Sequence, residues 1–145
     1  AGKDYSQARA FFQGALNQFP GLVDAKRQLA ETDFQEGAAM AAAGGDPKAA
    51  SQLLYKAYAE TGEVLKAAAK NGGLIPFIGP DKFLGEVYSL KAADLAALRA
   101  VEGKNLRNTA KMKAEFETAL KEALRLNPEG RLAKELNDRY SLQGF

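Results

Sequence analysis

The stretch DYSQARAFFQGALNQFP, residues 4–20, carries the signals of a complete amphipathic helix. Asp4 is a typical N-cap, because its short carboxylate can accept a hydrogen bond from a free backbone N–H. Apolar residues then recur at spacings of three and four and predict one buried face, which comprises Tyr5, Ala8, Phe12, Ala15, Leu16 and Phe19, widened by Phe11. Pro20 and Gly21 end the helix.

Five further segments show the same helical spacing of apolar residues, and short turns separate them. They run over about residues 22–43, 47–70, 81–102, 106–126 and 129–141. Asp46 and Pro47 mark one of the starts, since aspartate caps a helix and proline is tolerated at its first position. Alanine is abundant while valine, isoleucine and threonine are sparse, which favours helix over strand. The sequence therefore predicts an all-α fold of about six helices.

The composition excludes several classes of function without identifying one. The 145 residues suit one domain, and a net charge of +2 is too small to indicate nucleic acid as a partner. The chain has no cysteine and no histidine, which excludes disulfides, thiolate chemistry, Cys-ligated metals and the commonest general acid–base residue. No apolar run reaches about 18 residues, so we expect no membrane span. We also expect no cofactor and no catalysis. The cellular compartment stays open.

Two segments of the chain share one pattern of small and large residues. When the segment from Asp4 is aligned with the segment from Asp46, the coinciding pairs are Ala8 with Ala50, Phe12 with Leu54, and Ala15 with Ala57. Small residues let two helices approach closely, while the large residue fills the space between turns. A pattern that recurs after 42 residues (from Ala8 to Ala50) predicts a helical repeat.

The opening segment resembles the second helix of the tetratricopeptide repeat, a helix–turn–helix unit. The matching positions are Asp4, Tyr5, Ala8, Phe12, Ala15, Leu16 and Pro20. ALRLNP at residues 123–128 is similar to the end of the same helix in a later repeat. Leu29-Ala30 and Leu95-Ala96 are similar to the leucine–small pair of the first helix. The resemblance implies antiparallel hairpins that stack as a right-handed superhelix.

The repeat departs from the family in its length. Its spacing of 42 residues exceeds the family's usual 34 by eight. The surplus fits residues 38–45, which follow Gly37, the residue that matches the family's glycine turn. Eight residues are about two helical turns, so an extended hairpin would keep its helix faces in phase.

The resemblance also bears on the domain as a whole. In the family, residues like GKDY at positions 2–5 join the two helices of one repeat. The resemblance implies that residues 1–145 form a single repeat domain. It also implies that this domain begins inside a repeat and is a fragment of a longer protein. The alternative is a natural terminus with the first helix as a cap. Because that helix has apolar residues on more than one face, we expect a homodimer through Phe11.

Members of the family bind peptides or proteins along a concave surface lined by their first helices. The resemblance implies a protein-interaction scaffold in which this surface comprises Asp24, Arg27, Glu31, Phe34 and Gln35. The alternative for Phe34 is a core position. The two-carboxylate clamp of chaperone-binding members cannot be assembled from these positions, so a partner held by its C-terminal carboxylate is not expected.

Three basic residues, Lys104, Arg107 and Lys111, are predicted on one helical face. Such a stripe can receive phosphate or an acidic peptide, although a solvated face is the simpler interpretation. No aromatic residues alternate with these cations, as they do where proteins stack on nucleic acid. Neighbouring acidic residues are interpreted as solvated surface or ion-pair partners. They are Asp33 with Glu36, Glu115 with Glu122, and Glu60 and Glu63 next to Lys66.

The segment NGGLIPFIGPDKF, residues 71–83, is neither helical nor polar. We expect its apolar side chains to cover the core, and Phe77 and Ile78 to be buried against the third and fourth helices. A helical pocket for a small apolar ligand, formed by this segment and the extended helices, is an alternative function. An enzyme of carboxylate–lysine type is a more remote alternative.

Overall fold

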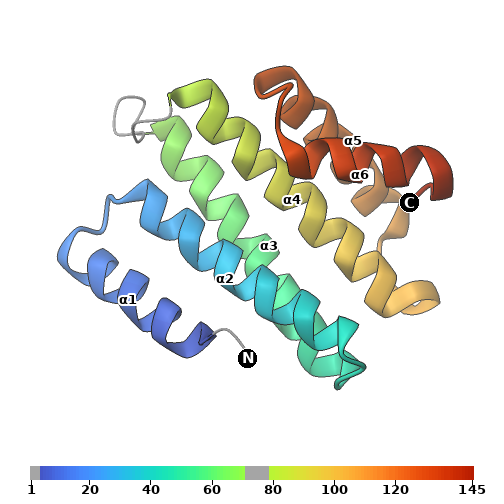
Figure 1. The fold of residues 1–145 in the computed structure, drawn as a ribbon, viewed down its shortest axis with the longest axis horizontal. Coiled ribbons are helices and arrows are strands. Elements are labelled where there is room, and N and C mark those ends of the chain that lie inside the picture. The colour runs from blue at the N-terminus through green and yellow to red at the C-terminus, as the bar shows by residue number, and fades with distance from the viewer. Residues whose placement is uncertain (1–3, 71–78) are drawn as a thin grey trace.

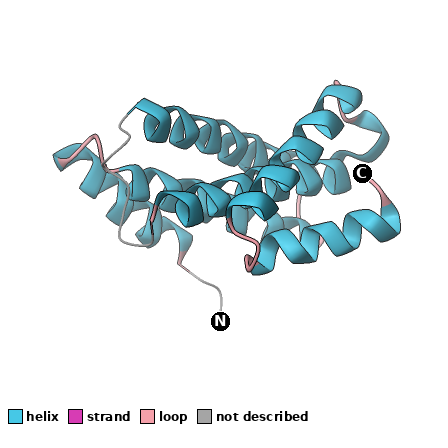
Figure 2. Ribbon diagram, turned by 90° about the horizontal axis from the view of Figure 1, so that it is seen from above, coloured by secondary structure: helices cyan, strands magenta, loops and turns pink. Residues whose placement is uncertain are grey.

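The computed structural model describes residues 4–70 and 79–145, which form six α-helices (Figure 1). They are α1 (Tyr5–Gln18), α2 (Val23–Ala42), α3 (Pro47–Lys70), α4 (Pro80–Glu102), α5 (Thr109–Leu126) and α6 (Arg131–Gln143). A short 3-10 helix, η1 (Gly103–Asn105), follows α4. Neither described range contains a strand (Figure 2), which confirms the all-α fold. None of the helices in these ranges is long and apolar enough to cross a membrane.

The helix starts follow the capping residues of the sequence. The carboxylate of Asp4 accepts a hydrogen bond of 2.9 Å from the backbone N–H of Gln7, and Asp46 accepts one of 3.0 Å from Lys48. Pro47 is the first residue of α3, where a missing N–H costs nothing. Both predicted N-caps are therefore confirmed.

Each helix packs on the next, and α4 is central to the arrangement. α1 contacts α2, α2 contacts α3, and α3 contacts α4. α4 also contacts α2, α5 and α6. In Figure 1 the helices α2, α4 and α6 lie toward the viewer, with α3 and α5 behind them. The even-numbered helices therefore lie side by side on one face of the molecule.

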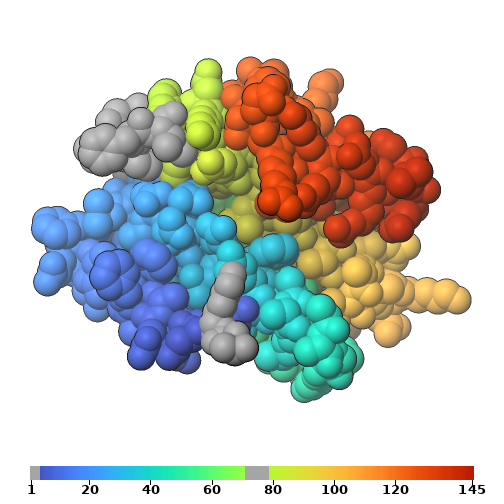
Figure 3. Space-filling view, viewed as in Figure 1, coloured from blue at the N-terminus to red at the C-terminus, as the bar shows by residue number. Residues whose placement is uncertain are grey.

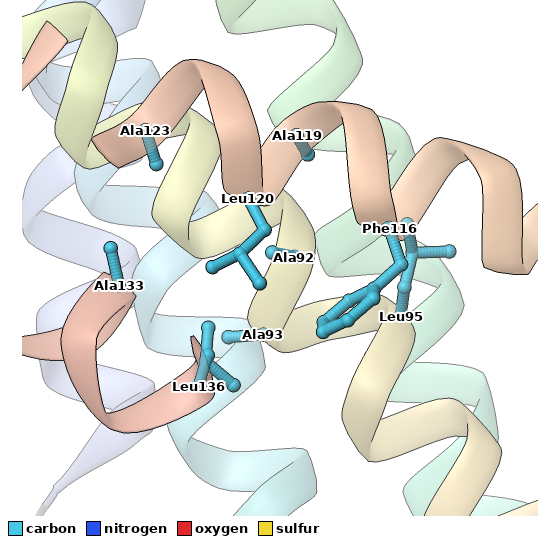
Figure 4. Close-up of a cluster of buried hydrophobic side chains, with 9 residues drawn as sticks. All are labelled: Ala92, Ala93, Leu95, Phe116, Ala119, Leu120, Ala123, Ala133 and Leu136. Atoms are coloured by element: carbon cyan, nitrogen blue, oxygen red, sulfur yellow. The ribbon is translucent and has the colours of Figure 1, made fainter. Parts of the chain in front are cut away.

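Three clusters of buried apolar side chains hold the helices together. The largest joins α4, α5 and α6 and comprises Ala92, Ala93, Leu95, Phe116, Ala119, Leu120, Ala123, Ala133 and Leu136 (Figure 4). A second cluster joins α2, α3 and the start of α4 through Val23, Val64, Ala68, Phe83 and Val87. The third comprises Leu54, Leu98 and Leu106. Alanine is frequent in the largest cluster, which permits the close approach of α4 and α5.

Gly37 lies inside α2 and not in a turn. A Cβ at this position would lie 3.0 Å from Cγ of Leu54 and 3.2 Å from the carbonyl oxygen of Ala50. The glycine therefore allows α2 and α3 to approach closely, and α2 continues to Ala42 before the chain turns at Gly44, whose φ is +72°. This geometry agrees with the helix predicted over residues 22–43 and with an extended hairpin, in which the helix continues past the position that matches the family's glycine turn.

Several sequence expectations differ from the structure at the helix ends. Phe19 was expected on the buried face of the first helix, but it is exposed because it lies at the C-cap of α1, where the chain turns toward α2. The fifth helix begins at Thr109, since Asn108 adopts the left-handed conformation with φ +56°. The expected burial of Phe77 and Ile78 lies outside the described residues.

Candidate functional site

A groove of about 320 Å³ opens on the face formed by the even-numbered helices. Figure 3 shows α4 recessed on this face between α2 and α6. We call this cavity the α2–α4 groove. It is lined by Arg27 and Glu31 of α2, by Glu86, Ser89 and Leu90 of α4, and by Asn127, Gly130, Arg131 and Leu132 of the α5–α6 connection and α6. Three separate parts of the chain therefore build it.

Arg27 is the electrostatic centre of the α2 edge of the groove. Its guanidinium forms ion pairs of 3.1 Å with Asp24 and 3.2 Å with Glu31, and it lies 3.9 Å from Glu86 of α4. The central carbon of the Arg27 guanidinium lies 6.0 Å from the centre of the buried Phe83 ring, which is a cation–π distance. The side chain of Arg27 is only 17% exposed, so its position is fixed from several sides.

At the opposite edge of the groove, the backbone of α4 lies very close to the α5–α6 connection. A Cβ on Gly85 of α4 would lie 2.6 Å from Cβ of Asn127, so only glycine fits there. This contact fixes the α5–α6 connection against α4. Leu132 is 37% exposed at this edge, and Leu90 of α4, which also lines the groove, is buried. Nearby, Arg131 forms an ion pair of 2.8 Å with Glu135. The groove thus has a charged edge on α2 and an opposite edge where the apolar side chain of Leu132 lies among polar and basic residues.

The structure brings most of the expected partner-binding residues to this edge. Arg27 and Glu31 line the groove, and Asp24 pairs with Arg27 beside it. Gln35 donates a hydrogen bond of 3.4 Å to Glu31 from the next turn of α2. Phe34 does not line the groove but packs half-buried against two of the apolar clusters, as its alternative interpretation stated. The far edge, residues 127–132, was not predicted.

The basic residues Lys104, Arg107 and Lys111 do not share a helical face. Lys104 lies in η1, Arg107 in the following turn, and Lys111 in the first turn of α5, and all three are exposed. The expectation of one stripe is wrong because the chain leaves the helical conformation at Gly103, with φ +55°, and again at Asn108. The three cations therefore do not belong to one helix.

A buried polar cluster connects α1, α2 and α3. Local sequence patterns do not reveal this connection. Asp33 is fully buried, and Arg9 of α1 donates two hydrogen bonds to its Oδ1, of 2.6 Å from Nη2 and 3.0 Å from Nε. Arg9 also donates to Glu36 at 3.1 Å. Lys56 Nζ lies 3.2 Å from Oδ2 of Asp33, within ion-pair range but outside hydrogen-bond geometry. Of the two interpretations of Asp33, solvated surface is wrong and ion pairing is confirmed.

Glu60 of α3 adds a second carboxyl group to this cluster. Burial and a hydrogen bond with Asp33 raise the pKa of Glu60 to about 8. Burial also acts to raise the pKa of Asp33, but hydrogen bonds with Glu60 and Arg9 and the charge of Lys56 outweigh it and hold this pKa below its usual range. Oδ2 of Asp33 and Oε1 of Glu60 are buried and have no donor. A proton between the two groups satisfies both atoms, so Glu60 is the protonated partner at neutral pH.

Asp94 on α4 is a further buried acid next to this cluster. It is fully buried, and its Oδ2 accepts a hydrogen bond of 3.0 Å from the hydroxyl of Thr61. Burial raises the pKa of Asp94 well above its usual range, the bond from Thr61 lowers it only in part, and Glu60 raises it further. No group of three or more acidic side chains in residues 4–70 and 79–145 is arranged to hold a metal ion. The cluster anchors Arg9 of α1 to buried and half-buried carboxylates of α2.

Comparisons with models of protein families, with curated proteins and with solved structures gave no match to this chain.

Proposed function

We propose that this chain is a protein-interaction scaffold of the tetratricopeptide type that binds a segment of a peptide or protein partner in the α2–α4 groove. The observation that carries the proposal is the position of the groove. It lies along α2 and α4, and its lining includes Arg27 and Glu31, at which the family resemblance implies contact with a partner. Its volume of about 320 Å³ accommodates a few side chains of such a segment. The proposed role involves binding alone and no catalytic step.

The packing of the repeat positions supports the tetratricopeptide assignment. Ala50, Leu54 and Ala57 of α3 are fully buried, as expected for the small–large–small positions of a second helix. α2 contacts α4 and α4 contacts α6, so successive first helices lie beside one another and would form one continuous binding face.

A peptide library displayed on phage and selected against the folded chain tests the proposal. A selected peptide is then titrated into ¹⁵N-labelled protein. We expect the largest amide shifts at Glu31, Leu90 and Leu132, and small shifts at exposed positions of α3 such as Gln52. Shifts that cluster outside the groove, or a library that yields no binder, would contradict the proposal.

Binding of a small apolar ligand is a second candidate, and one observation favours it. A depression of about 560 Å³ between the α2–α3 turn and the end of α4 is lined only by Ala41, Ala42, Gly44, Gly45, Pro47, Ala100 and Val101. No ionisable side chain is among them. Titration with indole should shift the methyl signals of Val101 if this depression binds apolar ligands, and Val101→Gln should abolish the shift.

Self-association through α1 is the proposed quaternary arrangement. Phe11 is 73% exposed and Phe19 is 62% exposed, and both belong to the outward side of α1 and its C-terminal end. Phe11 and Phe12 pack edge to face, with ring centres 5.3 Å apart, which orders the exposed ring. A second copy that covers this surface would remove two large aromatic groups from water.

A further inference from the structure

Carboxylates outnumber cations at the α2 edge of the α2–α4 groove. Asp24, Glu31 and Glu86 surround the single guanidinium of Arg27, which leaves a surplus of two negative charges, three minus one. The carboxylate side chains are 44%, 38% and 35% exposed, whereas Arg27 is 17% exposed. The cation therefore lies beneath its partners, and a ligand that approaches this edge meets carboxylate oxygens first.

The opposite edge offers apolar surface and no surplus charge. Leu132 is partly exposed and Leu90 of the same groove is buried, while the exposed Arg131 pairs with Glu135 at 2.8 Å. A ligand that fits both edges needs a cation on one side and an aliphatic group on the other. Arg27 is a poor receptor for an incoming acidic group, because its guanidinium already pairs with Asp24 and Glu31 and the three surrounding carboxylates repel a further anion.

From this arrangement we infer that the groove selects basic amphipathic segments, in which a lysine or arginine lies next to a leucine-like residue. The basic group pairs with Asp24 and Glu31, and the aliphatic group covers Leu90 and Leu132. Charge complementarity of this kind sets specificity and the rate of association, and it weakens with added salt. The inference rests on the proposed interaction function and names the chemical class of its partner.

Three fluorescein-labelled nonapeptides test it by fluorescence anisotropy. They share one leucine-containing sequence and differ at two positions, which carry lysine, glutamine or glutamate. We expect the lysine peptide to bind at least about tenfold tighter than the glutamate peptide in 50 mM salt, with the difference shrinking in 500 mM salt. The double variant Asp24→Asn/Glu31→Gln keeps the shape of the edge and should weaken the lysine peptide by about tenfold.

The control variant is Glu63→Gln/Glu122→Gln. It also removes two exposed carboxylates that pair with a cation on their own helix, Lys66 and Arg125, but both lie outside the groove. Its affinity for the lysine peptide should equal that of the unmodified chain. Equal affinity of the three peptides, or preference for glutamate, overturns the charge inference and leaves the interaction function standing. Failure of all three peptides and of every library-selected peptide overturns both.

Discussion

At the scale of single residues, the acids of the interior differ most from their ordinary behaviour. Asp33 keeps its charge because Arg9 and Lys56 face it, while Glu60 next to it carries a proton. Neither role follows from residue type, since both acids lie on helices among other charged residues. What decides between them is the number of cations that each carboxyl group faces inside the fold. Asp33 faces two cations at ion-pair distance, and Glu60 shares the proton that both groups need.

Stability should fall as the pH rises from about 5 to about 8. Glu60 has a pKa of about 8 in the folded chain and an ordinary value of 4.5 when unfolded, so across this interval the folded state binds the extra proton. The stabilisation from this group is complete below pH 4.5 and is lost by about pH 8. Asp94 acts in the same direction, whereas the lowered pKa of Asp33 matters only in more acidic solution. Thermal unfolding by circular dichroism should give a lower Tm at pH 8 than at pH 5.5, by at least about 3 °C.

The variant Glu60→Gln isolates the contribution of Glu60 to this pH dependence. Its amide can donate to Asp33 at every pH, so the fall in Tm should become clearly smaller, with only the part due to Asp94 remaining. Glu63→Gln is the matched control, because Glu63 lies on the same helix but is exposed and pairs with Lys66. An unchanged slope in Glu60→Gln would show that no proton is held at this position.

At the scale of helices, most of the fold could be read from the sequence. The apolar periodicity and the caps Asp4 and Asp46 predicted the number, type and approximate limits of the helices, because these signals are local. The residues at the α2 edge of the candidate groove were expected only from the resemblance to the tetratricopeptide repeat. Sequence reasoning missed the edge at residues 127–132 and the partner of Asp33, which lies 24 residues away at Arg9. Both depend on contacts between helices that no local pattern encodes.

The contact between α4 and the α5–α6 connection can be tested with a matched pair of glycines. Gly85→Ala places a Cβ 2.6 Å from Cβ of Asn127, and the clash should lower the free energy of unfolding by about 1–3 kcal/mol. Gly62→Ala in α3 meets nothing within 4 Å and should stabilise the chain by up to about 1 kcal/mol through helix propensity. Urea unfolding of both variants measures the two changes. Equal effects of the same sign would contradict the close packing at Gly85.

One arginine links α1 to the buried interior. α1 contains no fully buried residue, and Arg9 links it to the buried carboxylate of Asp33. Arg9→Gln should therefore leave the Asp33 carboxylate with too few hydrogen-bond donors. The free energy that holds α1 on α2 should fall by about 1–3 kcal/mol. Hydrogen exchange should accelerate over residues 5–18 more than over α4 and α5. In the control, Arg125→Gln removes an exposed pair with Glu122 and should change stability by less than about 1 kcal/mol. Uniform acceleration in all helices would contradict a local role.

At the scale of the whole molecule, the repeat positions show how neighbours determine burial. Ala50, Leu54 and Ala57 are fully buried because α3 packs between α2 and α4. The equivalent positions in α1, Ala8, Phe12 and Ala15, are only half-buried, since α1 contacts α2 alone among the described helices. The same sequence pattern therefore produces a core helix in one place and an open helix in the other. The open side of α1 is where a further helix would fit.

The last prediction concerns what covers that open side. If a second copy packs on it through Phe11, the chain should sediment as a dimer at high micromolar concentration. Phe11→Glu places a charge at the centre of this contact and should yield a monomer without unfolding, because the ring is 73% exposed within one copy. Leu142→Glu is the control, since Leu142 is 86% exposed on α6 and lies far along the chain from α1. Sedimentation equilibrium and circular dichroism measure assembly and folding separately. A monomer at several hundred micromolar, or a dimer that Leu142→Glu disrupts and Phe11→Glu does not, would show that α1 needs no second copy.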